Sequence, residues 1–142
     1  MHVTSNGAVY MLMGTLGFLV LGYLLTVLIE VPILCMGFGR KYPISETIIN
    51  GLLLTAVTYP VVIMVLPSLF QAAGSHNRLL YLAIAETFAP VAEVFFFRYL
   101  TNRPVIGKPD WEAIVIVAAN VASFLIGEAG LSRWLSTAVG NP

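Results

Sequence analysis

The chain has little charge of either sign. Only 10% of its 142 residues are Asp, Glu, Lys or Arg, and the formal net charge is zero, whereas a soluble domain contains roughly 25% charged residues. The seven basic residues are too scattered to form a surface that binds nucleic acid or anionic lipid. The composition therefore argues against an ordinary soluble domain and excludes a nucleic-acid partner.

Residues and motifs that bind metals or cofactors are also scarce. Cys35 stands alone, so no internal disulfide can form, and with His2 and His76 it makes no zinc-ligand pattern. The Glu-x-x-His of di-iron bundles, the P-loop, the dinucleotide fingerprint, the nucleophile elbow, HExxH and CxxC are all absent. We therefore expect no metal and no other cofactor, and an enzyme is not the favoured class.

Apolar sequence is abundant instead. Hydrophobic residues make up 58% of the chain, and the mean hydropathy is +0.90. Four runs reach the length of about 20 apolar residues that a membrane-spanning helix needs, and prolines, glycines and charges mark the loops between them. We predict an all-α integral membrane protein, one domain over residues 1–142, in which four transmembrane helices form an up-down antiparallel bundle. The predicted helices cover about 8–38, 44–70, 78–101 and 111–136.

Basic residues in the predicted loops favour one orientation. The first and third loops contain Arg40, Lys41, Arg103 and Lys108, with Arg98 nearby, and the positive-inside rule places such loops on the inner side. Both termini are then outside. Glu-x-Pro in one span, a Glu pair in another and Asn-x-x-Ser in the last resemble the pattern of small bacterial membrane proteins. This resemblance implies a bacterial inner membrane and carries no activity with it.

Acidic residues lie at membrane depth in three of the four spans. Glu30 precedes Arg40 by ten residues, which is about 15 Å of helix. Glu86 and Glu93 are almost two helical turns apart and share one stripe, and Glu128 lies nearer the end of the last span. An ionisable side chain in a membrane is costly, so it faces protein or water and by default marks a functional site. We therefore expect Glu30 and Glu93 to face the bundle interior.

Counting residues from the helix ends arranges the polar side chains in levels. The inner level contains Glu30, Asn50 and Glu93, the middle level contains Thr58 and Asn120 with Ser123 on the same face as Asn120, and the outer level contains Glu86 and Glu128. Two carboxyls and an amide at one level would share a proton, because adjacent carboxylates resist joint ionisation. Alternatively, they would chelate a hard cation through oxygen ligands.

Two structural interpretations compete with a binding site. Arg98 follows Glu93 by five residues and could reach back to it, which would make the inner level an ion pair. Asn50, Thr58, Asn120 and Ser123 could each serve only to hold helices together, since an interhelical hydrogen bond of about 1 kcal/mol is reason enough for one polar residue.

A weak internal similarity suggests a two-helix parallel repeat. Glu30 precedes Arg40 by ten residues, as Glu93 precedes Arg103, and each of these spans is followed by one that contains an asparagine. Some small transporters contain parallel repeats. Chance is the alternative, because the distances that link the matched residues differ.

Three classes of function remain open. The favoured class is a proton- or cation-handling channel or transporter of the lipid bilayer, expected to be a homo-oligomer because one four-helix bundle has little room for both a pathway and its gates. The second is a non-catalytic subunit or assembly factor that binds other membrane subunits. The third is an intramembrane enzyme that uses Glu86 and Glu93 as acid and base on a lipid. The regular seam of Glu, Asn and Thr favours the first.

Overall fold

The computed structural model describes residues 5–39, 41–74, 77–104 and 110–139, with side chains described from 16 to 130 apart from Phe18. In order they form α1 (Ser5–Phe38), α2 (Ile44–Pro60), the π-helical segment η1 (Val61–Val65), α3 (Leu66–Ala72), α4 (Arg78–Leu100) and α5 (Trp111–Val139). Since α2, η1 and α3 follow one another directly, the described residues contain four helical stretches long and apolar enough to cross a membrane. These stretches indicate an integral membrane protein.

The helix ends lie close to the predicted positions. The first helix begins at Ser5 rather than at residue 8, and the last ends at Val139 rather than at residue 136. His2, Arg40, His76 and Lys108 lie outside the described residues.

Local sequence explains how several helices begin and end. The side-chain oxygen of Asn77 accepts a hydrogen bond from the Leu80 N–H at 3.1 Å, and that of Asp110 accepts one from the Ala113 N–H at 3.1 Å. Such caps satisfy N–H groups that the first turn of a helix leaves free. After α1, Gly39 has a φ of 54°, the left-handed conformation that ends many helices and suits glycine.

Pro67 accounts for the π-helical turn in the second span. A proline inside a helix has no N–H, and its ring clashes with the carbonyl four residues earlier. The chain widens ahead of Pro67, so that the Leu66 N–H bonds to the Val61 carbonyl five residues back. In this wider register Pro67 stands five residues after Val62 and has no N–H to give to the Val62 carbonyl. The hydroxyl of Tyr81 donates to it at 2.9 Å, which ties η1 to α4.

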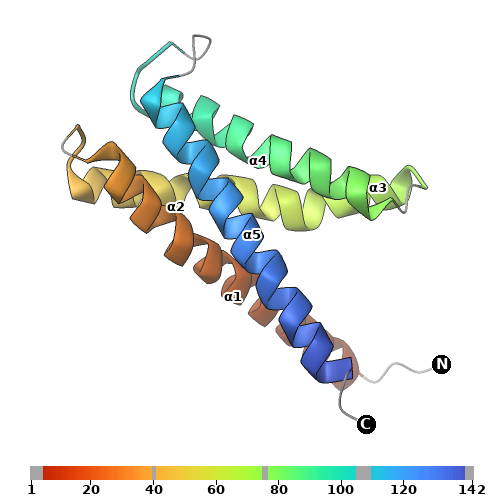
Figure 1. Ribbon diagram of the computed structural model, residues 1–142. Coiled ribbons are helices and arrows are strands. Elements are labelled where there is room, and N and C mark those ends of the chain that lie inside the picture. Colours follow the sequence, from red (N-terminus) through yellow and green to blue (C-terminus); the bar gives the residue numbers. More distant parts are fainter. Residues whose placement is uncertain (1–4, 40, 75–76, 105–109, 140–142) are drawn as a thin grey trace.

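The helices form two pairs that meet at one end and separate towards the other. Figure 1 shows α1 and α5 side by side, and α2, η1 and α3 running beside α4. The pairs converge where α1 ends and α5 begins, and they diverge towards α3 and the far end of α5. The arrangement is a wedge that is closed at one end.

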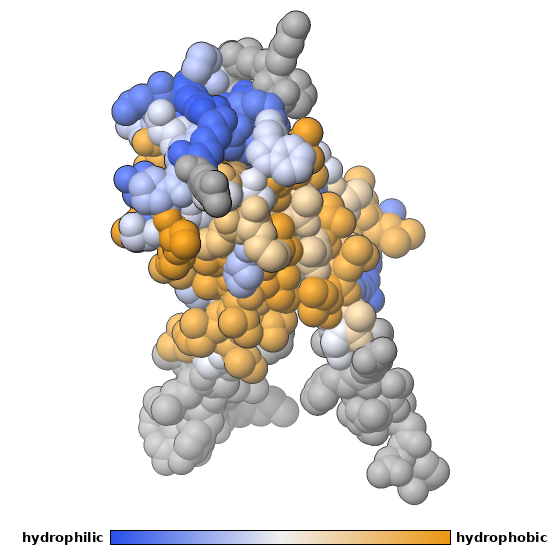
Figure 2. All heavy atoms as spheres, turned by 60° about the vertical axis from the view of Figure 1, so that its left-hand side comes forward, coloured by the Kyte–Doolittle hydropathy of each residue, from blue (hydrophilic) through white to orange (hydrophobic). Residues whose placement is uncertain are grey.

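A hydrophobic core fills the closed end of the wedge. Leu34, Phe38, Leu54, Phe97 and Ile116 are buried there, and the rings of Phe38 and Phe97 lie 4.9 Å apart. Lipid chains are as apolar as this core, so close packing rather than exclusion of water holds such helices together. Figure 2 shows hydrophilic residues gathered at this end, beyond an apolar body.

Glycines allow the helices to approach one another. A Cβ built on Gly37 of α1 would overlap the side chain of Val115 on α5, and a Cβ on Gly51 of α2 would lie 2.9 Å from Val31 of α1. Small residues at such crossings permit the backbone contact that membrane helices use. The two glycines therefore fix the spacing of α1 against both of its neighbours.

Candidate functional site

Glu30 of α1 and Glu93 of α4 face the interior, as the sequence predicted, and each is only 3% exposed. Each carboxyl is held by one side chain from α2 and one from α5. The partners on α2 are three residues apart, and so are those on α5. Residues at this spacing lie on one helix face, so the two helices present matched pairs of polar groups to the two carboxyls.

Two hydroxyls hold Glu30. Thr55 Oγ1 donates to Oε2 at 2.9 Å, and Ser123 Oγ donates to Oε1 at 2.7 Å. Each hydroxyl also lies within hydrogen-bonding distance of a backbone carbonyl of its own helix. Thr55 Oγ1 is 3.0 Å from the Gly51 carbonyl oxygen, and Ser123 Oγ is 2.9 Å from that of Asn120. A hydroxyl has one hydrogen and two lone pairs. It can therefore donate to an ionised Glu30, or donate to the carbonyl and accept from a protonated Glu30, without any heavy atom moving.

Glu93 has one such hydroxyl and one fixed donor. Thr58 Oγ1 lies 2.8 Å from Oε1 of Glu93 and 3.0 Å from the Leu54 carbonyl, so it has the same choice. Asn120 Nδ2 donates to Oε2 at 2.7 Å and to the Ile116 carbonyl at 3.0 Å. Both hydrogens of this amide are engaged, and an amide nitrogen accepts none. A proton on Glu93 therefore belongs on Oε1, opposite Thr58.

A cavity of about 150 Å³ adjoins the two carboxyls, and all four spans line it. Its polar lining consists of Thr26, Glu30, Thr55, Thr58, Tyr59, Glu86, Glu93, Asn120 and Ser123. Water takes about 30 Å³ per molecule in the liquid, so this space suits a few waters or a small polar group. The cavity lies on the open side of the hydrophobic core.

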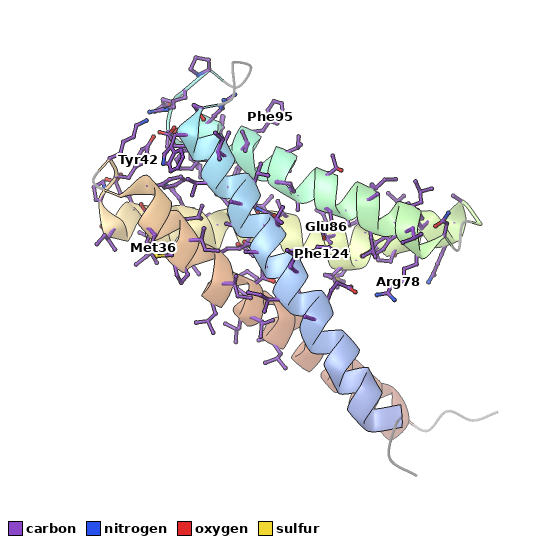
Figure 3. The ribbon with its side chains drawn as sticks, viewed as in Figure 1. Met36, Tyr42, Arg78, Glu86, Phe95 and Phe124 are labelled. Carbon is purple, nitrogen blue, oxygen red and sulfur yellow. The ribbon has the colours of Figure 1, made fainter. Side chains whose placement is uncertain are left out.

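Glu86 is the third carboxyl of this cavity. It projects from α4 towards the space that Phe124 of α5 also lines (Figure 3), and it is half-buried. No described side chain donates a hydrogen bond to it, in contrast to Glu30 and Glu93. Glu86 is therefore the carboxyl that is open to a ligand or to water.

Glu128 lies outside the cavity, in an ion pair with Arg78. The guanidinium of Arg78, at the start of α4, is 3.1 Å from Oε2 of Glu128 on α5, and both side chains are substantially exposed. Figure 3 shows Arg78 at the diverging end of the wedge. An exposed pair of this kind contributes about 0–1 kcal/mol in water, so the pair adds little to the stability of the fold.

Asn50 is not part of the carboxyl layer. It lines a separate surface groove with Glu46, Thr101 and Asn102. Asn50 is six residues into α2 and Thr55 is eleven, so at 1.5 Å per residue Thr55, the partner of Glu30, lies about 7.5 Å further along the helix. Assigning depth by counting residues from the helix ends assumes that the helices lie parallel with their ends level. These helices cross, so equal counts do not give equal depths.

Arg98 does not reach back to Glu93. It lies in the last turn of α4, is 7% exposed, and its guanidinium is 3.5 Å from Asp110 Oδ2. Both oxygens of Glu93 are bound by Thr58 and Asn120 instead. The interpretation of Glu93 as a member of an ion pair with Arg98 is therefore wrong.

Sequence reasoning missed Thr55 and the charged cluster at the closed end. Glu112 is 2% exposed, forms ion pairs with Lys41 and with Arg103, and accepts a hydrogen bond from the Tyr42 hydroxyl at 3.1 Å. Burial, together with this bond to Glu112, raises the pKa of Tyr42 above its ordinary value. The sequence did show an acid, Glu112, in the first turn of a helix and basic residues in the loops. An acid in that position is usually solvated, so this pattern alone did not predict a buried cluster.

No described group of three or more His, Cys, Asp or Glu side chains is placed to hold a metal ion. Comparison with protein families, with curated proteins and with solved structures finds no match.

Proposed function

We propose that this protein is a proton-coupled membrane carrier of cations, in which Glu30 and Glu93 bind protons and Glu86 meets the cation. The observation that supports this most is the pair of buried carboxyls whose hydroxyl partners fit the protonated and the ionised form equally well. A site that must gain and lose a proton repeatedly needs this property. Carboxyls within membrane proteins commonly belong to proton relays and ion pathways.

The same geometry argues against carboxyls that only hold helices together. An amide or hydroxyl would form the same interhelical hydrogen bonds without the cost of a group that can ionise in the membrane. It also argues against Glu93 as an acid or base that acts on a lipid, because both of its oxygens are already bound. Glu86 alone would not supply the acid and base pair that such an enzyme needs.

An alternating carrier fits the wedge better than an open channel. The cavity lies on the diverging side, and Leu34, Phe38, Leu54 and Phe97 pack between it and the charged end. A proton or cation would cross this apolar layer only if the helices rearrange. The π-helical turn η1, which borders the cavity, is the natural hinge, since π-turns frequently occur at functional sites.

The membrane setting belongs to the same proposal. The four spans would alternate in direction across a bacterial inner membrane with both termini outside, and two or more copies would assemble. The matched way in which Glu30 and Glu93 are held supports a two-helix repeat. Asn50 and Asn120, which correspond in that repeat, occupy different environments, so any duplication has diverged.

Flux measurements on the purified protein in liposomes test the proposal. With a cation gradient imposed and an internal pH dye as readout, the wild type should move protons against the cation. Glu93→Gln should abolish the coupled flux, whereas Glu46→Gln, at an exposed acid outside the cavity, should leave it unchanged. Absence of flux in the wild type, or equal flux in Glu93→Gln, would refute the proposal.

A further inference from the structure

A second pocket lies next to the carboxyl cavity and is almost entirely apolar. Its volume is about 240 Å³, and Val20 and Tyr23 of α1 face Ala56 and Met64 of the second span across it. Val20 and Met64 are 56% and 55% exposed, so the pocket opens on the outer surface that a bilayer would cover. A molecule dissolved in the membrane could therefore enter it sideways.

Tyr59 joins the two pockets, since it lines both of them. Its hydroxyl lies against Gly22 of α1, so close that a Cβ on that residue would overlap it. Tyr23 packs edge-on against the ring with a centroid distance of 6.0 Å. A molecule that occupied both pockets would lie against Tyr59, and aromatic rings attract cations.

We propose that the two pockets form one binding site for a membrane-soluble organic cation with an alkyl chain. The chain lies in the apolar pocket, and the ammonium head lies in the carboxyl cavity beside Glu86, with Tyr59 lining both parts of the site. The inference rests on the proposed function and names the class of its cargo.

Size and charge both favour this occupant. A dry cavity of about 150 Å³ accepts a benzene ring, so by proportion 240 Å³ accepts roughly ten carbons and the carboxyl cavity accepts a small ammonium head. An inorganic cation would make no favourable contact with the apolar pocket. A neutral lipid chain would have no use for three carboxyls. Entry of a fixed positive charge with release of one proton leaves the charge of the cavity unchanged, which couples cargo to protons.

Binding to the full-length protein in lipid nanodiscs tests this inference. Decyltrimethylammonium carries the chain and a permanent charge, tetramethylammonium carries the head alone, and decanol carries the chain alone. Calorimetry in two buffers of different ionisation enthalpy reports both the affinity and the protons released. We expect saturable binding of decyltrimethylammonium with release of up to one proton, and much weaker binding of decanol.

Variants that fill the apolar pocket separate it from ordinary partition into lipid, which is the same for every variant. Ala56→Leu and, from the opposite wall, Val20→Phe should each weaken decyltrimethylammonium binding at least tenfold and change tetramethylammonium binding less than twofold. Ala83→Leu, at an exposed alanine of α4 that lines neither pocket, is the matched control. Glu86→Gln should weaken binding of both cations.

The outcomes distinguish the two proposals. If tetramethylammonium releases protons but the pocket-filling variants bind decyltrimethylammonium normally, the chain site is wrong while the proton-coupled carrier stands. Decanol binding as tightly as decyltrimethylammonium would show that the pocket takes ordinary acyl chains only, and would overturn the inference. If no cation of any kind releases a proton, the proposed function fails and this inference fails with it.

Discussion

Replacing Glu93 with glutamine tests whether this carboxyl is a proton site or a structural charge. The glutamine carbonyl can accept from Asn120, and its amide can donate to Thr58 while Thr58 donates to the Leu54 carbonyl, since all these atoms are already 2.7–3.0 Å apart. Every hydrogen bond is then kept. The free energy of unfolding should fall by less than about 1 kcal/mol, which is the net contribution of one hydrogen bond.

Glu93→Leu is the matched comparison, because it removes the acceptor and keeps a similar volume. The Asn120 N–H that now donates to Glu93 would be buried without a partner, at a cost of about 1–3 kcal/mol. Thr58 would suffer less, since its hydroxyl can turn to the Leu54 carbonyl. The two variants should therefore differ clearly in thermal unfolding of the detergent-solubilised protein, with Glu93→Gln near the wild type.

A much larger loss of stability in Glu93→Gln would contradict this expectation. If Glu93 were the partner of a buried cation, Glu93→Gln would strand that cation and remove about 3–5 kcal/mol. Such a loss would show that Glu93 is an ion-pair member and would refute the proton site. The ion pair of Arg98 with Asp110 leads us to expect the small loss.

Three further predictions concern packing and the charged end. Gly37→Ala, which forces a methyl group against Val115, should cost about 1–3 kcal/mol by overpacking, whereas Gly17→Ala meets nothing within 4 Å and should leave thermal unfolding unchanged. Glu112→Gln should lower the unfolding midpoint markedly, because Lys41 and Arg103 lose the buried carboxylate with which they pair. A hydrogen bond to a charged group contributes about 1.5–3 kcal/mol. Because its pKa is raised, Tyr42 should stabilise the fold fully below a pH of about 10 and lose that contribution as the pH rises further, which ultraviolet difference titration against Tyr42→Phe can check.

The four spans were predictable because apolar runs long enough for a bilayer leave few alternatives. Likewise, the inward direction of Glu30 and Glu93 follows from the cost of placing a carboxyl against lipid. Neither inference needs knowledge of how the helices pack. Both are decided by chemistry local to one helix.

The partners of the carboxyls were not predictable in the same way. Asn50 and Thr55 lie five residues apart on α2, and which of them meets Glu30 depends on the crossing of α1 and α2. That crossing is set by contacts such as Gly51 against Val31, which no single helix reveals. Thr55 also resembles any threonine whose hydroxyl bonds four residues back in its own helix, and that bond is indeed present at 3.0 Å.

The two carboxyls are held alike but are not equivalent, and the difference is a single side chain. Ser123 beside Glu30 can turn its hydrogen away, whereas Asn120 beside Glu93 always presents one. Glu30 can therefore hold a proton on either oxygen, and Glu93 on one only. In the proposed carrier, a proton would have one position at Glu93 and two at Glu30, so the side chains of α5 would set which oxygen of each carboxyl carries it. If the protein couples protons to a cargo, this asymmetry between Asn120 and Ser123 is where the order of the steps is encoded.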